Sequence, residues 1–147
     1  MTYLVDTNIL VRLVDIQSSQ HQATSDAIKL LLTKKQDLYI IYESLIEFWV
    51  VATRDKNDNG LGLSTDAADK EIFNLLKVFL LLPDASLFAE WRALVNANHI
   101  SGYKAYDTRL VAAMNLHSID ALLTFNDADF KYYGIRVETP TEVLAKP

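Results

Sequence analysis

Short runs of β-forming residues alternate along this chain with segments whose apolar residues recur at helical spacing. The runs typical of strands cover residues 3–5, 38–42, 78–82, 121–124 and 136–138. Helical patterns fill most of the chain between these runs. Strands that alternate with helices throughout a chain favour a parallel sheet covered on both faces. The alternation therefore predicts an α/β fold.

The helical patterns also indicate where the helices begin and end. One begins just after Asp6-Thr7-Asn8, and Ser44 is expected to open the helix that follows the second strand. Ser64 is a good N-cap for another helix. Residues 54–63 form the only long loop-like stretch, which is too short for a domain linker. The predicted helices cover about 9–14, 20–33, 44–53, 64–77, 86–98 and 104–116.

Length and composition limit the kinds of protein that this chain can be. With 147 residues, half of them hydrophobic, it can bury one core, and we expect a single domain over 1–147. Without cysteine it has no disulfide, thiol nucleophile or cysteine-based zinc site, and its three histidines are scattered. No secretory signal or membrane-length apolar run is evident, which predicts a cytoplasmic protein. Its net charge of −5 argues against a nucleic-acid partner unless a local feature overcomes it.

Acidic residues stand near the ends of the predicted strands. Asp6 follows the first strand, and Glu47 lies one turn into the helix after the second. Asp107 lies near the start of the helix before the fourth strand, which Asp127 and Asp129 follow. In a parallel sheet, side chains that follow the strands can converge at one edge. We therefore expect an acidic site there.

Each of these acids has a purely structural alternative. Asp6 can be a helix N-cap, and Ser44 with Glu47 fits a capping box. Asp107 can complement a helix dipole, and Asp127 can form an Asx turn. The functional hypothesis therefore depends on the set rather than on any one residue.

Carboxylates gathered in one place need a counter-charge. Two of them about 5 Å apart repel by roughly 3 kcal/mol at an effective dielectric constant near 20. A divalent cation removes this repulsion, and oxygen ligands without Cys or His select Mg²⁺ or Mn²⁺ over zinc. Mg²⁺ usually keeps several waters and is shared with substrate phosphate. The acidic set therefore predicts metal-dependent phosphoryl chemistry.

Four segments of the chain can be taken together, namely Val5-Asp6-Thr7-Asn8-Ile9-Leu10, Ser44-Leu45-Ile46-Glu47-Phe48, 107–113 and 123–130. As a set they resemble the PIN domain family, and in particular its bacterial VapC-like toxin ribonucleases. Gly60-Leu61-Gly62-Leu63-Ser64 also resembles a segment of the toxin-like members. The resemblance covers nearly the whole chain. It implies a three-layer α/β/α sandwich with a mostly parallel central sheet.

The resemblance also implies a function and a set of site residues. PIN domains are metal-dependent ribonucleases that hydrolyse RNA phosphodiester bonds, with one or two Mg²⁺ or Mn²⁺ ions. The fourth ligand is expected to be Asp129, with Asp127 and Asn126 as alternatives. The residues that match the family's three principal acidic ligands are Asp6, Glu47 and Asp107.

Residues around the acids are candidates for substrate contacts. Tyr103 and Tyr106 can stack on unpaired bases or serve in packing, and Tyr106 stands where many relatives have His. Arg12 and Lys56 are further candidate cations, and each cation can equally be a solvated surface charge. The predicted substrate-binding residues are Thr7, Asn8, Arg54, Lys104, Arg109 and Asn126.

The toxin-like relatives imply protein partners as well as RNA, namely a small antitoxin and a second copy of the chain in a homodimer. Two alternatives to a ribonuclease stay open. One is a PIN-like interaction module that has lost catalysis. The other is a different Mg²⁺-dependent phosphotransfer enzyme on a similar sheet. A haloacid-dehalogenase-like phosphatase is disfavoured, because it needs an Asp where this chain has Asn8.

Overall fold

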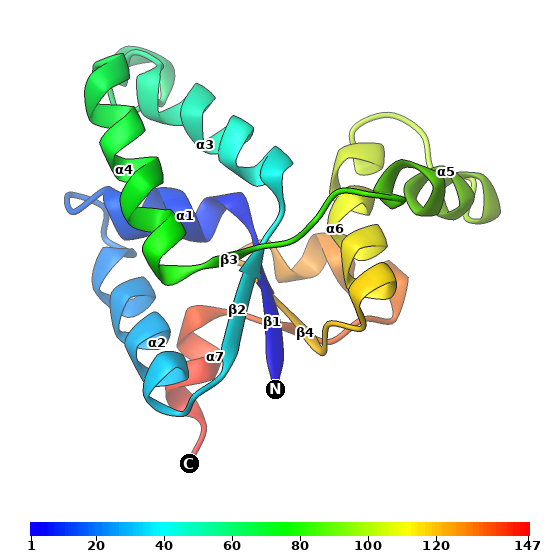
Figure 1. Ribbon diagram of the computed structural model, residues 1–147. Helices are drawn as coiled ribbons and strands as arrows, with labels where there is room; N and C mark the ends of the chain where they lie inside the picture. Colours follow the sequence, from blue (N-terminus) through cyan, green and yellow to red (C-terminus); the bar gives the residue numbers. More distant parts are fainter.

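One five-stranded sheet lies at the centre of the computed structural model, which describes residues 1–147 (Figure 1). The strand order is β3-β2-β1-β4-β5, and every neighbouring pair is parallel. The predicted parallel sheet is confirmed. The strands are β1 (Thr2–Val5), β2 (Asp37–Ile40), β3 (Leu80–Leu81), β4 (Ala121–Leu123) and β5 (Val137–Glu138).

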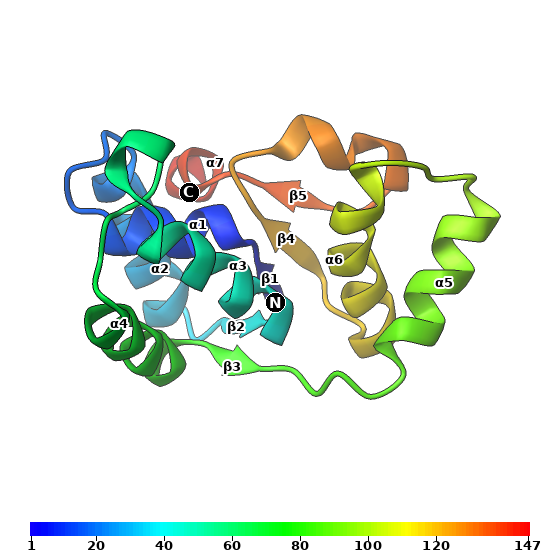
Figure 2. The ribbon, with the colours of Figure 1, turned by 90° about the horizontal axis from the view of Figure 1, so that it is seen from above.

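Helices cover both faces of this sheet. In Figure 2, α5 and α6 lie on one side of the strands and α1, α2 and α4 on the other. The helices are α1 (Thr7–Val14), α2 (His21–Thr33), α3 (Tyr42–Thr53), α4 (Thr65–Val78), α5 (Leu87–Ala97), α6 (Lys104–His117) and α7 (Pro140–Ala145), with 3₁₀ segments η1 (Lys56–Asp58) and η2 (Asp127–Tyr133).

The side chains of β1 alternate between two hydrophobic cores. Tyr3 and Val5 belong to a cluster built with α1, α2, α3, α4 and α7. Leu4 belongs to a second cluster, built mainly with α6 and β4. Successive residues of a strand point to opposite faces, so β1 is buried on both. The α/β/α sandwich that the resemblance implied is thus confirmed.

The structure corrects the predicted start of α3. The helix begins at Tyr42, after the extended residue Ile41, although the sequence predicted a strand to 42 and a helix from Ser44. Ser44 is therefore buried inside the helix, and Glu47 bonds to other elements, so the capping box is wrong. An apolar run does not distinguish a strand end from a first helical turn.

Two other predictions need correction. The strand expected over 78–82 contains only Leu80–Leu81, because α4 continues to Val78. The turn expected around Asp127 is a 3₁₀ helix. In addition, the short helix α7 was not predicted.

The position of β1 between β2 and β4 brings distant segments to one edge of the sheet. Leu4 pairs with Leu122, and Val5 with Leu123. The Asp6 N–H continues the ladder by donating to the Leu123 carbonyl at 3.0 Å. Residues that follow β1, β2 and β4 therefore emerge side by side.

The loop after α3 folds back on the end of that helix. The N–H groups of Leu61 and Gly62 donate to the carbonyls of Val51 and Arg54 at 2.9 and 2.8 Å. A Cβ on Gly60 would lie 2.0 Å from the Arg54 carbonyl oxygen, so only glycine fits there. The close approach holds Arg54 next to the carboxyl edge of the sheet.

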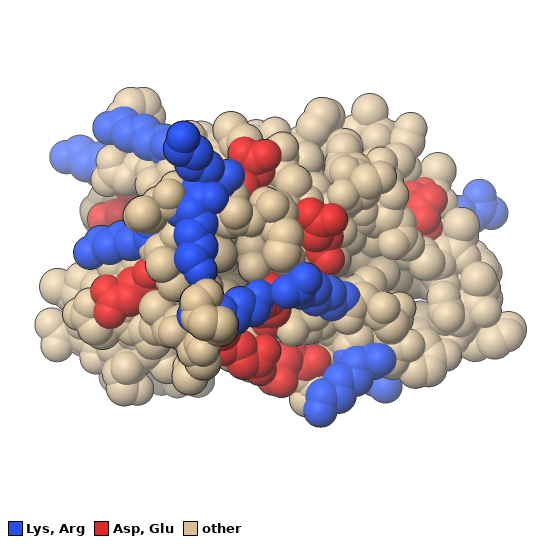
Figure 3. Space-filling view, turned by 90° about the horizontal axis from the view of Figure 1, so that it is seen from below, with Lys and Arg blue, Asp and Glu red and all other residues tan.

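The surface carries charges of both signs. On the face seen in Figure 3, acidic and basic side chains lie next to one another, and neither sign covers a large continuous area. None of the helices combines the length and the apolar character that a membrane crossing requires.

Candidate active site

Asp6 stands at the carboxyl end of β1 and caps α1. Its side chain is only 9% exposed. It accepts hydrogen bonds from the Thr7 N–H at 2.7 Å, the Thr124 hydroxyl at 2.8 Å and the Asn8 amide at 3.2 Å. Burial raises the pKa of Asp6 to about 6, and the charges of Asp107 and Glu47 act in the same direction. The helix cap and the candidate site position thus coincide in Asp6.

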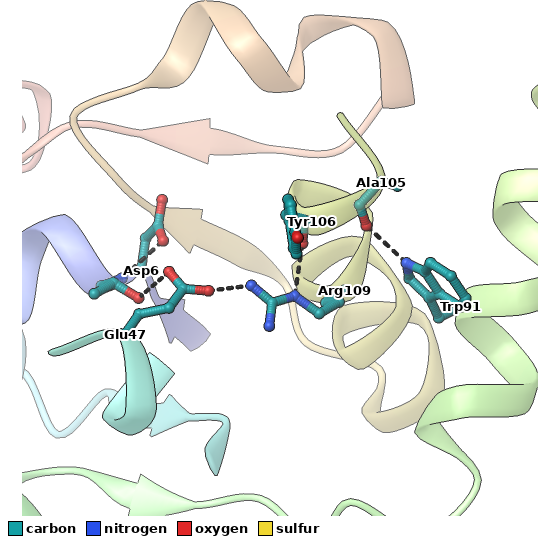
Figure 4. A network of polar contacts seen from close by, with 7 residues as sticks. Asp6, Glu47, Trp91, Ala105, Tyr106 and Arg109 are labelled. Carbon is teal, nitrogen blue, oxygen red and sulfur yellow. Dashed lines mark hydrogen bonds and ion pairs between the residues drawn. The ribbon is translucent and has the colours of Figure 1, made fainter. Parts of the chain in front are cut away.

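Glu47 reaches the same place from α3. Its Oε2 accepts a hydrogen bond from the Thr7 hydroxyl at 3.1 Å. Its Oε1 forms an ion pair with the Arg109 guanidinium, as Figure 4 shows. Arg109 also donates through Nε to the Tyr106 carbonyl at 2.9 Å, and its guanidinium lies 5.4 Å from the centre of the Tyr106 ring. The ion pair therefore joins α3 to α6 beside Asp6.

Asp107 lies in the first turn of α6, opposite Glu47. Burial raises its pKa, and the charges of Asp129 and Glu47 raise it further, while Arg109 lowers it. Asp6, Glu47 and Asp107 line one small cavity of about 10 Å³. Asp129 is exposed in η2, yet its charge acts on Asp107. The structure thus brings three of the predicted acids to one cavity, and the charge of Asp129 acts on Asp107 from outside it.

The site suits a hard cation in its chemistry but not in its present geometry. Its donors are carboxylate oxygens, and neighbouring negative charges add to burial in raising the pKa of Asp6 and of Asp107, which is the charge problem that Mg²⁺ or Mn²⁺ relieves. However, no group of three or more His, Asp or Glu side chains is arranged to hold an ion. A cavity of about 10 Å³ has room for about one water. In this conformation the Glu47 carboxylate is already engaged by Thr7 and Arg109.

Most, but not all, of the predicted substrate-binding residues lie near the acids. Thr7 and Asn8 contact the acids directly, and Arg109 pairs with Glu47. A shallow depression of about 390 Å³ opens from the acids, and its lining includes Asp6, Thr7, Asn8, Arg12, Glu47, Arg54, Asp107 and Asn126.

Two of the candidate cations face other depressions. Lys104 borders one with Asn98 and His99, and Lys56 borders another with Val14. Proximity to Asp107 in sequence did not place the Lys104 side chain at the acidic edge.

Thr124 is a site residue that the sequence analysis missed. Besides donating to Asp6, its hydroxyl accepts hydrogen bonds from the Asn8 amide and the Asn126 N–H, both at 3.0 Å. It directly follows β4, the strand next to β1. A polar residue at the end of a strand was the available signal.

An apolar groove of about 830 Å³ lies next to the acids. Tyr106 and Arg109 line both the groove and the small acidic cavity. Tyr103 and Tyr106 are 89% and 65% exposed, so neither is a core packing residue. Trp91, on the groove wall, is held by a hydrogen bond of 2.7 Å to the Ala105 carbonyl (Figure 4). Exposed aromatic rings thus border the candidate site.

Comparison with known proteins identifies the family to which this fold belongs. A family model described as the PIN domain matches residues 3–135. The chain belongs to the PIN domain family. No curated protein matches this PIN domain in sequence.

Solved structures resemble this PIN domain over nearly its whole length. A structure of VapBC2 from Rickettsia felis, bound to a DNA fragment from its promoter, has a TM-score of 0.70 at 17% identity, covering 95% of this chain and 98% of that one. Mycobacterium tuberculosis VapC20, a toxin that cleaves the sarcin-ricin loop, has a TM-score of 0.63 at 20% identity, with coverages of 90% and 95%. A toxin-antitoxin complex from Klebsiella pneumoniae has a TM-score of 0.62 at 21% identity, with coverages of 94% and 97%. These likenesses establish a shared fold.

Proposed function

We propose that this PIN domain is a metal-dependent endoribonuclease and the toxin of a toxin-antitoxin pair. The observation that carries the proposal is the convergence of Asp6, Glu47 and Asp107 at one sheet edge, where Asp6 has no cationic partner. A carboxylate buried without a cation is costly, and such a cost is typical of sites that bind a metal ion. The similarity to an RNA-cleaving toxin supports RNA as the substrate.

The acids would hold Mg²⁺ or Mn²⁺, and each neighbour has a part in fixing them. A bound divalent cation would neutralise charge on the scissile phosphate and lower the pKa of an attacking water. Thr7, Asn8 and Thr124 hold the Asp6 carboxylate in one orientation by hydrogen bonds from three directions. Thr7 also holds Glu47, which links the two acids through one residue.

Asp129 is our choice for the fourth acid. Its charge raises the pKa of Asp107, whereas Asp127 has no such influence on either acid with a raised pKa. Asn126 lines the wider depression and is better suited to a substrate contact.

Single-stranded RNA is the form of substrate that the surroundings favour. Exposed aromatic rings such as those of Tyr103 and Tyr106 stack on unpaired bases. Arg54 and Arg12 line the depression around the acids and can contact phosphates. The cations at this edge would offset the overall negative charge of the protein.

An antitoxin and a second copy of the chain are the proposed protein partners in a cytoplasmic complex. The support for the antitoxin comes from the relatives, since the Klebsiella pneumoniae structure is a toxin-antitoxin complex and the Rickettsia felis one is VapBC2 on promoter DNA. A bound antitoxin that covered the acidic edge would block the cleavage of RNA.

The decisive test is the cleavage of unstructured and structured RNA by wild type, Asp6→Asn and Asp107→Asn. Removing one negative charge at the site should lower the rate about 100-fold or more, the size typical of a lost electrostatic catalytic group. Asp66→Asn, on the exposed first turn of α4, is the matched control and should keep the rate. Wild-type activity in Asp6→Asn, or cleavage that survives EDTA, would refute the mechanism. A wild type that binds metal but cleaves neither RNA would favour the silent interaction module.

A further inference from the structure

Arg109 supplies the cationic partner of Glu47 in the acidic site. Its guanidinium reaches from α6 to the Glu47 carboxylate on α3 (Figure 4). The hydrogen bond from its Nε to the Tyr106 carbonyl anchors the base of the guanidinium. The remaining nitrogens are therefore free to change partners while this anchor stays in place.

This ion pair explains why the acids do not form a metal site in the present conformation. Both oxygens of Glu47 have a partner, Thr7 on one and Arg109 on the other. The small cavity between the acids is too small for an ion that keeps several of its waters. Arg109 therefore neutralises the Glu47 charge that would attract a metal ion, and it lines the small cavity that the ion would have to enter.

The pair is also accessible enough to open. The Arg109 side chain is 26% exposed and the Glu47 side chain 45%. Arg109 borders the apolar groove as well as the acidic cavity, so an open volume lies beside it. A pair this exposed contributes only about 0.2–1 kcal/mol, which metal binding can exceed.

We propose that Arg109 is a displaceable counter-ion, which pairs with Glu47 when the site holds no metal and is released from Glu47 when a divalent cation binds. This inference rests on the proposed function, because it requires that the acids bind metal. Arg109 acts here through Glu47, because it occupies that carboxylate only while no metal is bound. Once released, its guanidinium would lie between the acids and the apolar groove, where Tyr106 is proposed to stack on RNA bases.

A permanent ion pair and a displaceable one predict opposite changes in metal affinity when Arg109 is removed. If Arg109 holds Glu47 in the orientation that the metal requires, its loss weakens metal binding. If Arg109 competes with the metal, its loss strengthens binding. The sign of the change therefore separates the two roles.

The experiment is a calorimetric titration of wild type, Arg109→Met and Arg54→Met with Mn²⁺ alone. We expect Arg109→Met to bind Mn²⁺ about 1.5-fold to fivefold more tightly, the range set by an ion pair of this exposure. Arg54 lines the depression beside the same acids but has no ion pair, so Arg54→Met controls for repulsion at a distance and should change affinity much less. Weaker or unchanged binding in Arg109→Met, or an equal gain in Arg54→Met, would overturn the proposal.

A second measurement uses the unaltered side chain. In ¹H–¹⁵N spectra of the wild type, the Arg109 Nε–H signal should shift as Mg²⁺ is added. If signals from residues around Asp6 shift while that of Arg109 does not, the proposal is wrong and the metal site stands. If neither shifts, the metal-binding function itself fails, and the inference with it.

Discussion

Two buried carboxylates at strand ends have opposite surroundings. Glu138, at the end of β5, is 4% exposed, and Asp6, after β1, is 9% exposed. Glu138 accepts a hydrogen bond from the Tyr3 hydroxyl at 2.9 Å and pairs with Lys146 and with Arg136, the latter at 3.5 Å. Asp6 is held only by uncharged donors, namely a backbone N–H, a hydroxyl and an amide.

The difference indicates which carboxylate serves the fold and which is available for function. A buried charge is tolerated when it is paired, and Glu138 has two cations of its own. Asp6 keeps its orientation but lacks positive charge, and its pKa is raised to about 6 as a result of burial. Cationic partners, rather than burial, separate the structural acid Glu138 from Asp6, the acid proposed to be functional.

The largest expected effect is on the pH dependence of stability. The folded pKa of Asp6, about 6, lies above its ordinary value of 3.8, so folding favours the protonated form. Its stabilising contribution is therefore complete below about pH 4 and is lost as the pH rises through 6. The full change is about 3 kcal/mol in the free energy of unfolding, and about half of it falls between pH 5 and 7.5.

Urea unfolding in EDTA at several pH values measures this change. Asp6→Asn should flatten the profile between pH 5 and 7.5, with only the smaller contribution of Asp107 left in the same direction. If stability depends on pH in the same way in wild type and Asp6→Asn, Asp6 is not the uncompensated carboxylate that its contrast with Glu138 suggests.

A bound metal ion should stabilise the protein through Asp6 and not through Glu138. At 100 times its dissociation constant, Mn²⁺ should raise the free energy of unfolding by about 2.7 kcal/mol. A thermal melt should then shift upward by several degrees in wild type and Glu138→Gln, but not in Asp6→Asn. An equal shift in all three proteins would place the ion elsewhere.

Glu138→Gln should cause the smallest of these changes in the free energy of unfolding. It should lower that free energy, whereas Asp6→Asn should not. Losing the carboxylate breaks the contacts of Lys146 and Arg136, which are partly exposed and regain water. We expect a loss of about 2 kcal/mol, below the range for fully buried pairs. In EDTA at pH 7.5, Asp6→Asn should leave stability equal or higher, because it removes a buried charge that has no cationic partner. Urea unfolding of the two variants side by side tests this, and an unchanged Glu138→Gln would show that its cations contribute little.

The positions of Asp6 and Glu47 could be predicted from the sequence because they depend on the topology of the sheet. A parallel sheet sends the residues after β1, β2 and β4 to one edge, and Asp6 and Glu47 follow from that. The short helix α7 could also have been found, since Thr139 caps it and Pro140 stands at its first position.

The partners of the acids could not be predicted in the same way. Glu47 and Arg109 are 62 positions apart, and their pairing depends on how α3 and α6 face each other across the sheet edge. Lys104 was predicted to serve the site from its closeness to Asp107, yet it borders another depression. The spacing of residues in a sequence determines which turn of a helix each side chain belongs to. The direction in which a long side chain extends depends on tertiary packing, which no local pattern encodes.

The edges of the sheet restrict how two copies of this protein could associate. Both edge strands, β3 and β5, contain only two residues. So short a strand offers too few free main-chain groups for another chain to add to the sheet. Any self-association must therefore join helical surfaces, such as the one where Ile46 and Val50 of α3 stand exposed, which leaves the central sheet of each copy unchanged.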